Sequence, residues 1–508
     1  LFGVTRATLA DRVGRFALVG GVTAAASSYM WLPFLMYSPY INVTPYLERF
    51  KYDSYGAPAI LTWLVSGDLL DHGRIPVLTV LLGIGAVAAV VTRARLALLS
   101  VGLFALWLVL YFGRPTLGGL IDLLPLSDGL FLHRLIGAVD IFAVLLIGIG
   151  GAWLWDLARA SSTRTRLTAA TAAALLLLAP ALGERRATYA QGAEWMRRTQ
   201  AALDADADAR AVMDALRREP PGRVYAGHDN NWGRTLDFGI PFTSVRFYNL
   251  IAHHGLDAAA PPNQSLSLNA DLLWDFDDQD LSHYRLFNVS YVVAPRGRAF
   301  PPELRALVTT AKYVLYAAPG RGYAEYAAIA GREAPATQRE LFARELAWLR
   351  GGDPGRWSFT RFDYPHATEA RAAVPTPACA GGEVAYQRVQ PARFDVLARC
   401  ATASAMVVKV TYHPNWRVTV DGTEVPTFMA SPSLLAFALP AGDHFVVAEY
   451  RSTPLKAPLL ILGGVVLGAA GAVSRRAWLL GSPGRVRALL VRLRPLQPQW
   501  SQRRARRD

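Results

Sequence analysis

The chain has 508 residues, of which 52% are hydrophobic and 18% are charged, and its formal net charge is +14. The length allows a membrane bundle together with one or two soluble domains. Basic residues are concentrated beside apolar segments, and residues 474–508 hold ten Arg and a single Asp. Basic residues in such places are typical of the ends of membrane spans that face anionic lipid. The positive charge therefore does not indicate a nucleic-acid partner.

Six windows are apolar and long enough to cross a membrane, whose hydrocarbon core of about 30 Å needs roughly 17–25 residues. Segments such as VLTVLLGIGAVAAVV are apolar on every side, whereas a buried helix of a soluble protein usually has one apolar face. We therefore predict six membrane spans, at Phe16–Tyr37, Ile75–Val91, Leu96–Phe112, Leu135–Trp155, Leu167–Gly183 and Ala457–Val473.

The short connections between these windows predict the orientation of the chain. Arginines precede the first span, separate the second from the third and the fourth from the fifth, and follow the sixth. Cytoplasmic loops are rich in Arg and Lys, so we expect both ends of the chain in the cytoplasm. Segments 38–74, 113–134 and 184–456 are then extracytoplasmic. Only four of the 53 basic residues are Lys, which together with the Ala and Gly content is typical of a GC-rich bacterial genome. We expect the chain to lie in the bacterial inner (plasma) membrane.

The segment 184–456 is too long for a loop and predicts folded protein. Residues 191–218 have a helical pattern, and strand-like runs follow at 223–227, 289–295, 312–318 and 323–329. These runs are interleaved with turns and short helical pieces. We predict a mixed α/β subdomain over residues 184–378.

From about Ala380 apolar and polar residues alternate as they do in strands, in seven short runs separated by turn residues. Asp421-Gly422 between two of these runs is a strong type I′ hairpin signal. We predict an extracytoplasmic β-sandwich over residues 379–455. The last span (456–474) and a basic cytoplasmic tail (475–508) complete the predicted organisation, which is a multi-pass helical membrane bundle with an outer α/β and β region.

The two cysteines of the sequence, Cys379 and Cys400, are symmetric about a point between Val389 and Gln390. A hairpin that turns at this point places the two thiols opposite each other. Because both lie in a segment predicted to face an oxidising compartment, a disulfide is favoured over a metal site. The alternative is a pair of buried free thiols.

The segment Tyr412–Thr453, followed by a membrane span, resembles the C-terminal end of YfhO-like bacterial membrane proteins. Segments 286–295 and 27–35 are similar to that group more loosely. The resemblance consists of a Trp-bearing strand, an Asp-Gly hairpin, a Pro-Ala-Gly turn and an aromatic last strand, carried here by Trp416, Asp421, Gly422, Pro440, Ala441, Gly442 and Tyr450.

This resemblance implies a GT-C type architecture, whose members transfer a sugar from a polyprenyl-phosphate donor on the outer face of the membrane. GT-C enzymes carry their catalytic acidic residue in the first extracytoplasmic loop and usually have more than six spans. The resemblance therefore implies that this chain corresponds to the C-terminal portion of such a protein.

The outer loop 38–74 supplies a candidate for catalysis. A carboxylate here could act as a base on an acceptor hydroxyl or hold a divalent cation. Asp53 is the preferred residue because Tyr52, Tyr55 and Trp63 could supply a surface for stacking a sugar. The alternative is that the acidic residues are solvated groups at the ends of spans.

The outer loop 113–134 supplies candidates for binding a lipid phosphate. Arg114, His133 and Arg134 lie near the outer interface, and Arg forms paired hydrogen bonds with phosphate oxygens. Asp140 lies further along the fourth span, where an ionisable group usually faces the interior of a bundle or a cavity. The alternative is that the arginines only extend to the headgroups and bind no ligand.

The polar segment 227–234 contains Asn230, Asn231 and Trp232, which suit either contact with a glycan or a plain turn. The acidic run 275–280 lacks a Gly-rich nucleotide loop, so we interpret it as a solvated turn. His253-His254 has no partner at the spacing of metal ligands, so we predict no zinc site there. No residue is assigned as a metal ligand, and the cofactor is left open, with a divalent cation as one possibility.

The leading hypothesis is a GT-C-like glycosyltransferase, or its C-terminal half, whose partners are membrane lipid, a polyprenyl-phosphate sugar and an envelope glycan acceptor. The second is a non-catalytic envelope membrane protein whose outer domain binds glycan or a protein partner. A transporter is disfavoured, because transporters typically combine broken or repeated spans with polar pairs inside the membrane. Asp140 alone fits that pattern.

Overall fold

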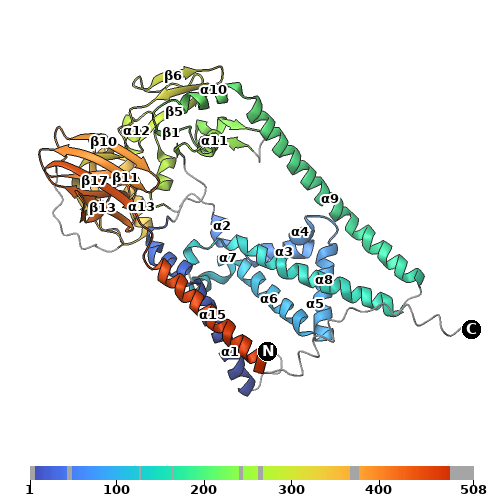
Figure 1. Cartoon of the computed structure of the whole chain (residues 1–508). Helices are drawn as coiled ribbons and strands as arrows, with labels where there is room; N and C mark the ends of the chain where they lie inside the picture. The colour runs from blue at the N-terminus through green and yellow to red at the C-terminus, as the bar shows by residue number, and fades with distance from the viewer. Residues whose placement is uncertain are drawn as a thin grey trace, which may run out of the picture. The chain divides into compact units, whose positions relative to one another are not determined.

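The computed structural model describes residues 6–42, 49–124, 127–161, 164–239, 244–260, 267–365 and 377–480. Contacts divide the chain into two compact units. In the first unit the first helix, α1 (Arg6–Tyr37), packs along the last, α15 (Lys456–Leu480) (Figure 1). The second unit contains residues 40–449, in which a group of helices is followed by the β-sheets.

Four helices among the described residues are long and apolar enough to cross a membrane: Arg12–Tyr40, Arg95–Phe112, Leu132–Ala160 and Lys456–Val473. They match four of the six predicted spans. The second predicted span is a shorter apolar helix, α5 (Val77–Thr92), whose 16 residues rise about 24 Å, less than the thickness of the hydrocarbon core. The fifth, 167–183, lies in the 42-residue helix α9 (Arg164–Ala205). The structure does not describe many of the side chains of residues 167–183, so the fifth membrane span stays a prediction.

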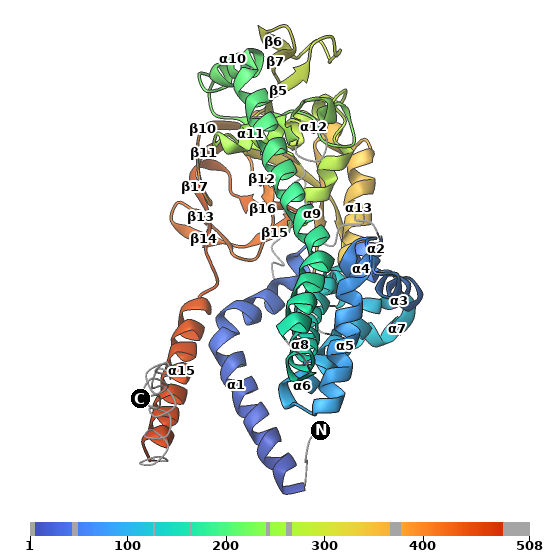
Figure 2. The same cartoon turned by 90° about the vertical axis from the view of Figure 1, so that its right-hand side faces the viewer.

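Helix α5 packs closely against helix α8 (Ile136–Ser161), beside α6 (Arg95–Phe112) (Figure 2). At the point of closest approach both helices have a glycine. A Cβ on Gly85 would overlap the carbonyl oxygen of Leu146, and one on Gly150 would overlap that of Leu81. Small residues let helix backbones approach to this extent, so these glycines set the spacing of the two helices.

The predicted α/β subdomain contains a five-stranded sheet with the order β4-β1-β5-β7-β6, in which β1 is parallel to both its neighbours and the rest is antiparallel. Helices α10 (Ala207–Leu216) and α11 (Phe247–His253) pack on one face of this sheet. Its strands are β1 (Arg223–Tyr225), β4 (Ala258–Ala259), β5 (Val289–Pro295), β6 (Arg305–Thr309) and β7 (Tyr313–Ala317). The mixed α/β prediction is confirmed for this region.

The C-terminal β region has two layers, but their composition differs from the predicted sandwich. One layer is a sheet with the order β10-β11-β17-β13-β14, and the other is a closed barrel, β12-β16-β15-β9-β8. The strands of the sheet are β10 (Glu383–Gln390), β11 (Arg393–Cys400), β13 (Trp416–Val420), β14 (Thr423–Val425) and β17 (Gly442–Tyr450). Those of the barrel are β8 (Ala324–Glu333), β9 (Ser358–Phe362), β12 (Ser404–Thr411), β15 (Thr427–Ala430) and β16 (Leu434–Leu439).

The barrel crosses the boundary that we predict at residue 379. Strands β8 and β9 precede that boundary, and helix α13 (Gln338–Arg350) lies between them in the chain. Strand β8 pairs with β12, and β9 pairs with β15. Alternation along a strand reveals which face is buried but not which strand is its neighbour. For this reason the sequence pattern assigns β8 to the wrong layer.

Cys379 and Cys400 form a disulfide, with 6.1 Å between their Cα atoms. The geometry differs from the predicted one, because Gln390 pairs with Arg393 and the hairpin turns two residues later than expected. Cys379 lies before the first strand of the hairpin. The Gly382 amide donates to the Cys379 carbonyl at 3.3 Å, and this turn folds Cys379 back towards Cys400.

Removing this disulfide should lower the free energy of unfolding. The bond closes a loop of 21 residues. By restricting the unfolded chain, closing a loop of that size raises the free energy of unfolding by about 3 kcal/mol. The Cys379→Ala/Cys400→Ala variant should therefore unfold at a lower guanidinium concentration than the wild type. Dithiothreitol should shift the wild type and leave the variant unchanged. Equal midpoints without reductant would contradict the prediction.

Candidate functional site

The two outer loops predicted to carry chemistry meet in the structure. Residues from the first loop form helix α2 (Arg49–Asp53), and those from the second form α7 (Arg114–Leu117) and η4 (Leu132–Leu135). Helix α2 contacts η4, and α7 directly follows the end of α6. Residues that are about 60 to 80 positions apart in the sequence are thus brought to one place.

The chain around Asp53 is fixed to the end of helix α6. The Ser54 hydroxyl donates to the Tyr111 carbonyl at 2.6 Å, and the Gly56 amide donates to the Phe112 carbonyl at 3.0 Å. Gly113 has a φ of 68°, and a Cβ at this position would overlap the Asp53 carbonyl oxygen. Both the left-handed backbone and the close approach require glycine here, so the sequence LYFGRP positions Asp53.

Asp53 and Arg114 lie together as the sequence interpretation requires. Their closest charged atoms, Oδ1 and Nη1, are 3.9 Å apart. The other end of the Arg114 guanidinium is 3.3 Å from the Asp122 carboxylate and donates to the Ser127 carbonyl at 3.1 Å. Arg114 therefore lies between two carboxylates, and its contact with Asp53 is the looser of the two.

His133 joins the same cluster through the backbone of α2. Its Nδ1 atom is 2.7 Å from the Lys51 carbonyl oxygen. Since a carbonyl only accepts hydrogen bonds, Nδ1 carries the proton, and Nε2 of a neutral ring is left as an acceptor. The ring also packs edge-on against Phe50 and Phe131, with centroid distances of 5.9 and 6.1 Å.

Arg134 and Asp140 lie further out. Arg134 is exposed, and its guanidinium carbon lies 4.8 Å from the centroid of the Phe131 ring. Asp140 is exposed on helix α8 and interacts electrostatically with His72 and Tyr111. The predicted face of His133, Arg134 and Asp140 is thus divided: His133 and Arg134 share Phe131, whereas Asp140 faces a different loop residue.

The aromatic residues predicted to stack a sugar flank Asp53. Tyr52 packs against Phe131 at a centroid distance of 5.1 Å, and Tyr55 packs edge-on against Trp63 at 5.0 Å. Tyr55 also stacks on Phe50 at 5.4 Å. These residues thus belong to a cluster of rings near α2, and the face of an aromatic ring is an apolar surface on which a sugar can stack.

Another acidic residue of this loop is occupied structurally. The buried Asp71 carboxylate accepts hydrogen bonds from the Leu78 amide at 2.9 Å, from the Thr79 amide at 3.0 Å and from the Thr79 hydroxyl at 2.9 Å. It therefore caps helix α5. Within the described ranges, no group of three or more His, Cys, Asp or Glu side chains could hold a metal ion.

The segment predicted to contact glycan is mostly held within the outer domain. Asn231 donates to the Tyr225 hydroxyl at 2.7 Å and accepts from the Gly233 amide at 2.9 Å. The Trp232 indole donates to Asp278 at 2.6 Å. Asn230 is exposed. Asn231 and Trp232 thus have structural partners, and Asn230 alone of the three presents its side chain to solvent.

The acidic run 275–280 is not simply a solvated turn. Asp278 is buried and pairs with Arg298 at 2.5 Å. Asp280 caps helix α12 (Leu281–Leu286) by accepting from the Ser282 amide at 2.8 Å. These carboxylates organise the chain beside the five-stranded sheet.

Sequence reasoning missed a group of buried charges in the outer domain. Lys409 is fully buried, with its Nζ atom 3.0 Å from Glu325, and Arg285 also pairs with Glu325. Burial lowers the pKa of Lys409 to about 8, although Glu325 acts in the opposite direction. The signal in the sequence is a lysine within the apolar strand AMVVKVTY, where a charge is expected only if it has a partner.

The chain matches no protein-family model, and no curated protein or solved structure is significantly similar to it. The resemblance to YfhO-like proteins therefore stays a prediction. The four apolar helices and the disulfide indicate a membrane protein. More particularly, they indicate one with an extracytoplasmic domain of mixed α/β and β structure.

Proposed function

We propose that the chain is a GT-C-like membrane glycosyltransferase, or its C-terminal half, that moves a sugar from a polyprenyl phosphate to an acceptor in the bacterial cell envelope. The observation that carries this proposal is the grouping of Asp53, Arg114 and His133 beside the end of an apolar helix. A carboxylate, a guanidinium and an imidazole together are suited to a phosphate-linked sugar.

Each group has a role in a direct displacement. The acceptor oxygen attacks the sugar C1 atom, the bond from C1 to the phosphate oxygen breaks, and Asp53 takes the proton of the acceptor. Arg114, His133 and Arg134 bind the polyprenyl phosphate that leaves. A phosphate that binds Arg114 would take this side chain away from Asp53 and leave the carboxylate free. Because Arg114 and Asp53 are 3.9 Å apart, losing their ion pair costs little free energy. We assign no divalent cation to this mechanism, because Arg114 already lies between Asp53 and Asp122.

In this proposal both termini are cytoplasmic and residues 184–456 are outside the cell membrane, as the Arg-rich connections predict. The outer loops of the bundle and the large domain then lie on the same side of the membrane. That side is where polyprenyl-phosphate sugars are used by GT-C enzymes.

The second candidate is a non-catalytic envelope protein that binds glycan or a protein partner. One observation favours it: Arg114 already has two carboxylates and a carbonyl as partners. A guanidinium with those partners can hold two loops together without any ligand.

Lipid binding and sugar transfer by the detergent-purified full chain test the proposal. Arg134→Ala should weaken binding of undecaprenyl phosphate about tenfold, the value of one charge-assisted contact. Arg134→Lys should restore binding only partly, since the paired hydrogen bonds are lost. Asp53→Asn should keep lipid binding and abolish consumption of polyprenyl-phosphate sugars from a bacterial membrane extract, followed by mass spectrometry.

Arg159→Ala is the matched control, because Arg159 is exposed near the opposite end of the same apolar helix. It should change neither lipid binding nor sugar consumption. Unchanged lipid binding in Arg134→Ala would contradict the lipid-phosphate site. Full consumption by Asp53→Asn would exclude Asp53 as the base, and lipid binding without any consumption by the wild type would favour the non-catalytic alternative.

A further inference from the structure

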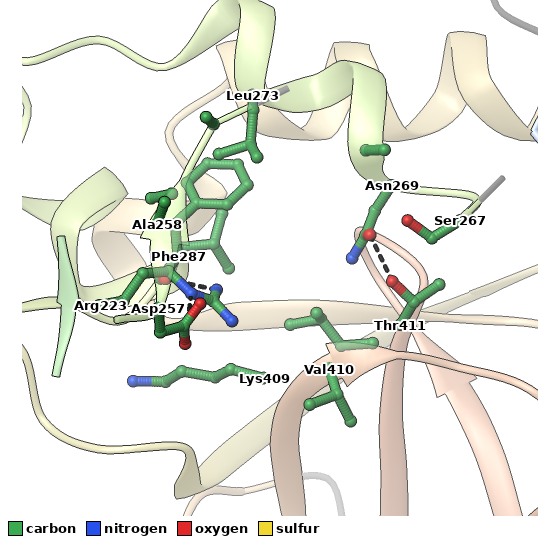
Figure 3. A pocket seen from close by; sticks show the side chains of 15 residues that line it. Arg223, Asp257, Ala258, Ser267, Asn269, Leu273, Phe287, Lys409, Val410 and Thr411 are labelled. Carbon is green, nitrogen blue, oxygen red and sulfur yellow. Dashed lines mark hydrogen bonds and ion pairs between the residues drawn. The ribbon is translucent and has the colours of Figure 1, made fainter. Parts of the chain in front are cut away.

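The outer domain contains a cavity of about 270 Å³, lined by residues of the five-stranded sheet and of the barrel (Figure 3). Arg223 belongs to β1, and Lys409 and Thr411 belong to β12. Asp257 precedes β4, and Asn269 precedes the short helix η6 (Ala270–Asp275). The lining residues extend from Arg223 to Leu434 in the sequence, so only the folded domain contains this cavity.

Polar groups enter the cavity from two opposite sides. Arg223 and Asp257 extend from one side, and Asn269 and Thr411 lie on the other (Figure 3). Arg223 is held by the Phe287 carbonyl at 2.8 Å and by Asp257 at 3.3 Å. The cavity thus presents a guanidinium and a carboxylate that are already oriented.

Asn269 has an unused donor. Its Oδ1 atom accepts from the Thr411 hydroxyl at 2.5 Å, which fixes the amide so that Nδ2 points towards the interior of the cavity (Figure 3). In the part of the chain that the structure describes, this Nδ2 atom has no hydrogen-bond partner. An oriented amide donor without a partner is suited to an oxygen atom of a ligand.

The charges around the cavity are unequal. Lys409 runs along its floor, and its ammonium group pairs with Glu325, which also pairs with Arg285. Among the residues that line the cavity, Arg223 and Lys409 are cationic and Asp257 is acidic. This excess of positive charge in the lining favours a ligand with one negative charge.

Apart from Ser267, the rest of the lining is apolar and includes Phe287, Leu273, Val410 and Leu434. A ligand that fits must therefore have an apolar face as well as several hydroxyl groups. A free phosphate ion lacks the apolar face. The cavity volume of about 270 Å³ is slightly below the usual range for ligand pockets, about 300–1,000 Å³, so the cavity suits one ring rather than a chain of rings.

We propose that this cavity binds a single sugar ring that carries a carboxylate, such as a uronic acid. Asp257 and Asn269 contact the ring hydroxyls, Arg223 pairs with the carboxylate, and Phe287 covers the apolar face of the ring. This site is separate from the proposed transfer of sugar at Asp53. Its ligand is a free or terminal acidic sugar, and no polyprenyl phosphate takes part.

Titration calorimetry of the detergent-purified full chain with D-glucuronate and D-glucose, at matched ionic strength, tests the site. D-glucuronate should bind at least tenfold more tightly than D-glucose, because Arg223 contributes a charge-assisted contact. Asn269→Ala should weaken glucuronate binding about tenfold. The Asn269 side chain bonds only to Thr411 among the described residues, so this variant should keep the thermal midpoint of the wild type.

Asn230→Ala is the matched control, since Asn230 is an exposed asparagine of the same domain that does not line the cavity. It should bind glucuronate like the wild type. Equal affinities for D-glucuronate and D-glucose would overturn the charge-selective site, and no binding of either sugar would overturn the sugar site itself. Unchanged affinity in Asn269→Ala would also overturn it. None of these outcomes changes the expected lipid binding at Arg134. The acidic-sugar site and the proposed glycosyltransferase function can therefore be contradicted independently.

Discussion

Replacing Glu345 by glutamine should stabilise the outer domain at neutral pH and remove much of the pH dependence of its stability. Glu345 lies on helix α13 and is fully buried. One carboxyl oxygen accepts from the Ser433 hydroxyl, and the other has no hydrogen-bond partner among the described residues. Burial raises the pKa of Glu345 to about 8, with Ser433 acting in the opposite direction.

The sign of the pH effect follows from where the proton is bound. Between the ordinary pKa of 4.5 and the folded value of about 8, the folded protein keeps a proton that the unfolded chain releases. The free energy of unfolding therefore falls as the pH rises through this window, by up to about 1.4 kcal/mol per pH unit from this group. Below pH 4.5 both states are protonated and this contribution is constant.

Glutamine has the shape of the protonated acid and no proton to lose. Glu345→Gln should therefore equal the wild type near pH 4.5 and exceed its free energy of unfolding by about 2–4 kcal/mol at pH 7.5. Guanidinium unfolding of the detergent-purified chain, followed by tryptophan fluorescence, measures this difference. Trp348, on the same helix, provides a local signal.

Glu424→Gln is the control, because the Glu424 side chain is 62% exposed and its replacement removes no buried carboxyl group. This variant should have the pH dependence of the wild type. A Glu345→Gln variant whose stability declines between pH 4.5 and 8 as steeply as that of the wild type would show that Glu345 is not the group responsible.

Adding one methyl group at Gly85 should destabilise the helical bundle, whereas the same change two residues earlier should not. A Cβ at Gly85 would overlap the backbone of α8, while a Cβ at Gly83 meets no heavy atom within 4 Å. Gly85→Ala must separate α5 from α8, at a cost of about 1–3 kcal/mol. Gly83→Ala should instead stabilise the helix by up to about 1 kcal/mol, since alanine has the higher helix propensity.

Thermal unfolding of the two variants in detergent, measured by the loss of the monodisperse chromatographic peak, distinguishes these expectations. The opposite signs exclude a general effect of changing glycine to alanine. Gly148→Ala on helix α8 is a second control, because a Cβ at Gly148 also has no neighbour within 4 Å. If Gly85→Ala and Gly83→Ala had the same midpoint, the close crossing of α5 and α8 would be wrong.

The sequence predicts the features of this fold that depend on local composition. Long apolar windows correspond to four helices that could span a membrane, and the alternating runs after residue 380 correspond to strands. Pairing between distant strands has no local signature. The barrel therefore contains β8, which the sequence pattern assigns to the α/β subdomain, and β9, which it does not predict as a strand.

In the candidate site too, the sequence predicts the residues that have a local signal but not the contacts between distant residues. Asp53, Arg114 and His133 are recognisable as polar residues in two outer loops, and the structure brings them together. The partner of Trp232 lies far along the chain, and the partner of Asn231 is reached only through a turn. The sequence pattern therefore does not predict the structural roles of these two residues. Lys409 is visible as a charge in an apolar strand, but its partner Glu325 is known only from the pairing of β8 with β12.

The closed barrel determines the order in which the outer domain can be completed during synthesis and export. Strands β8 and β9 leave the ribosome well before β12 and β15, which are their other neighbours in the ring, and before β16, which joins β12 to β15. Until those strands cross the membrane, β8 and β9 have unpaired edges that can pair with other chains. The barrel closes only after residue 439 has been exported, shortly before the last helix enters the membrane. The outer domain is therefore completed only when nearly all of its strands have been synthesised.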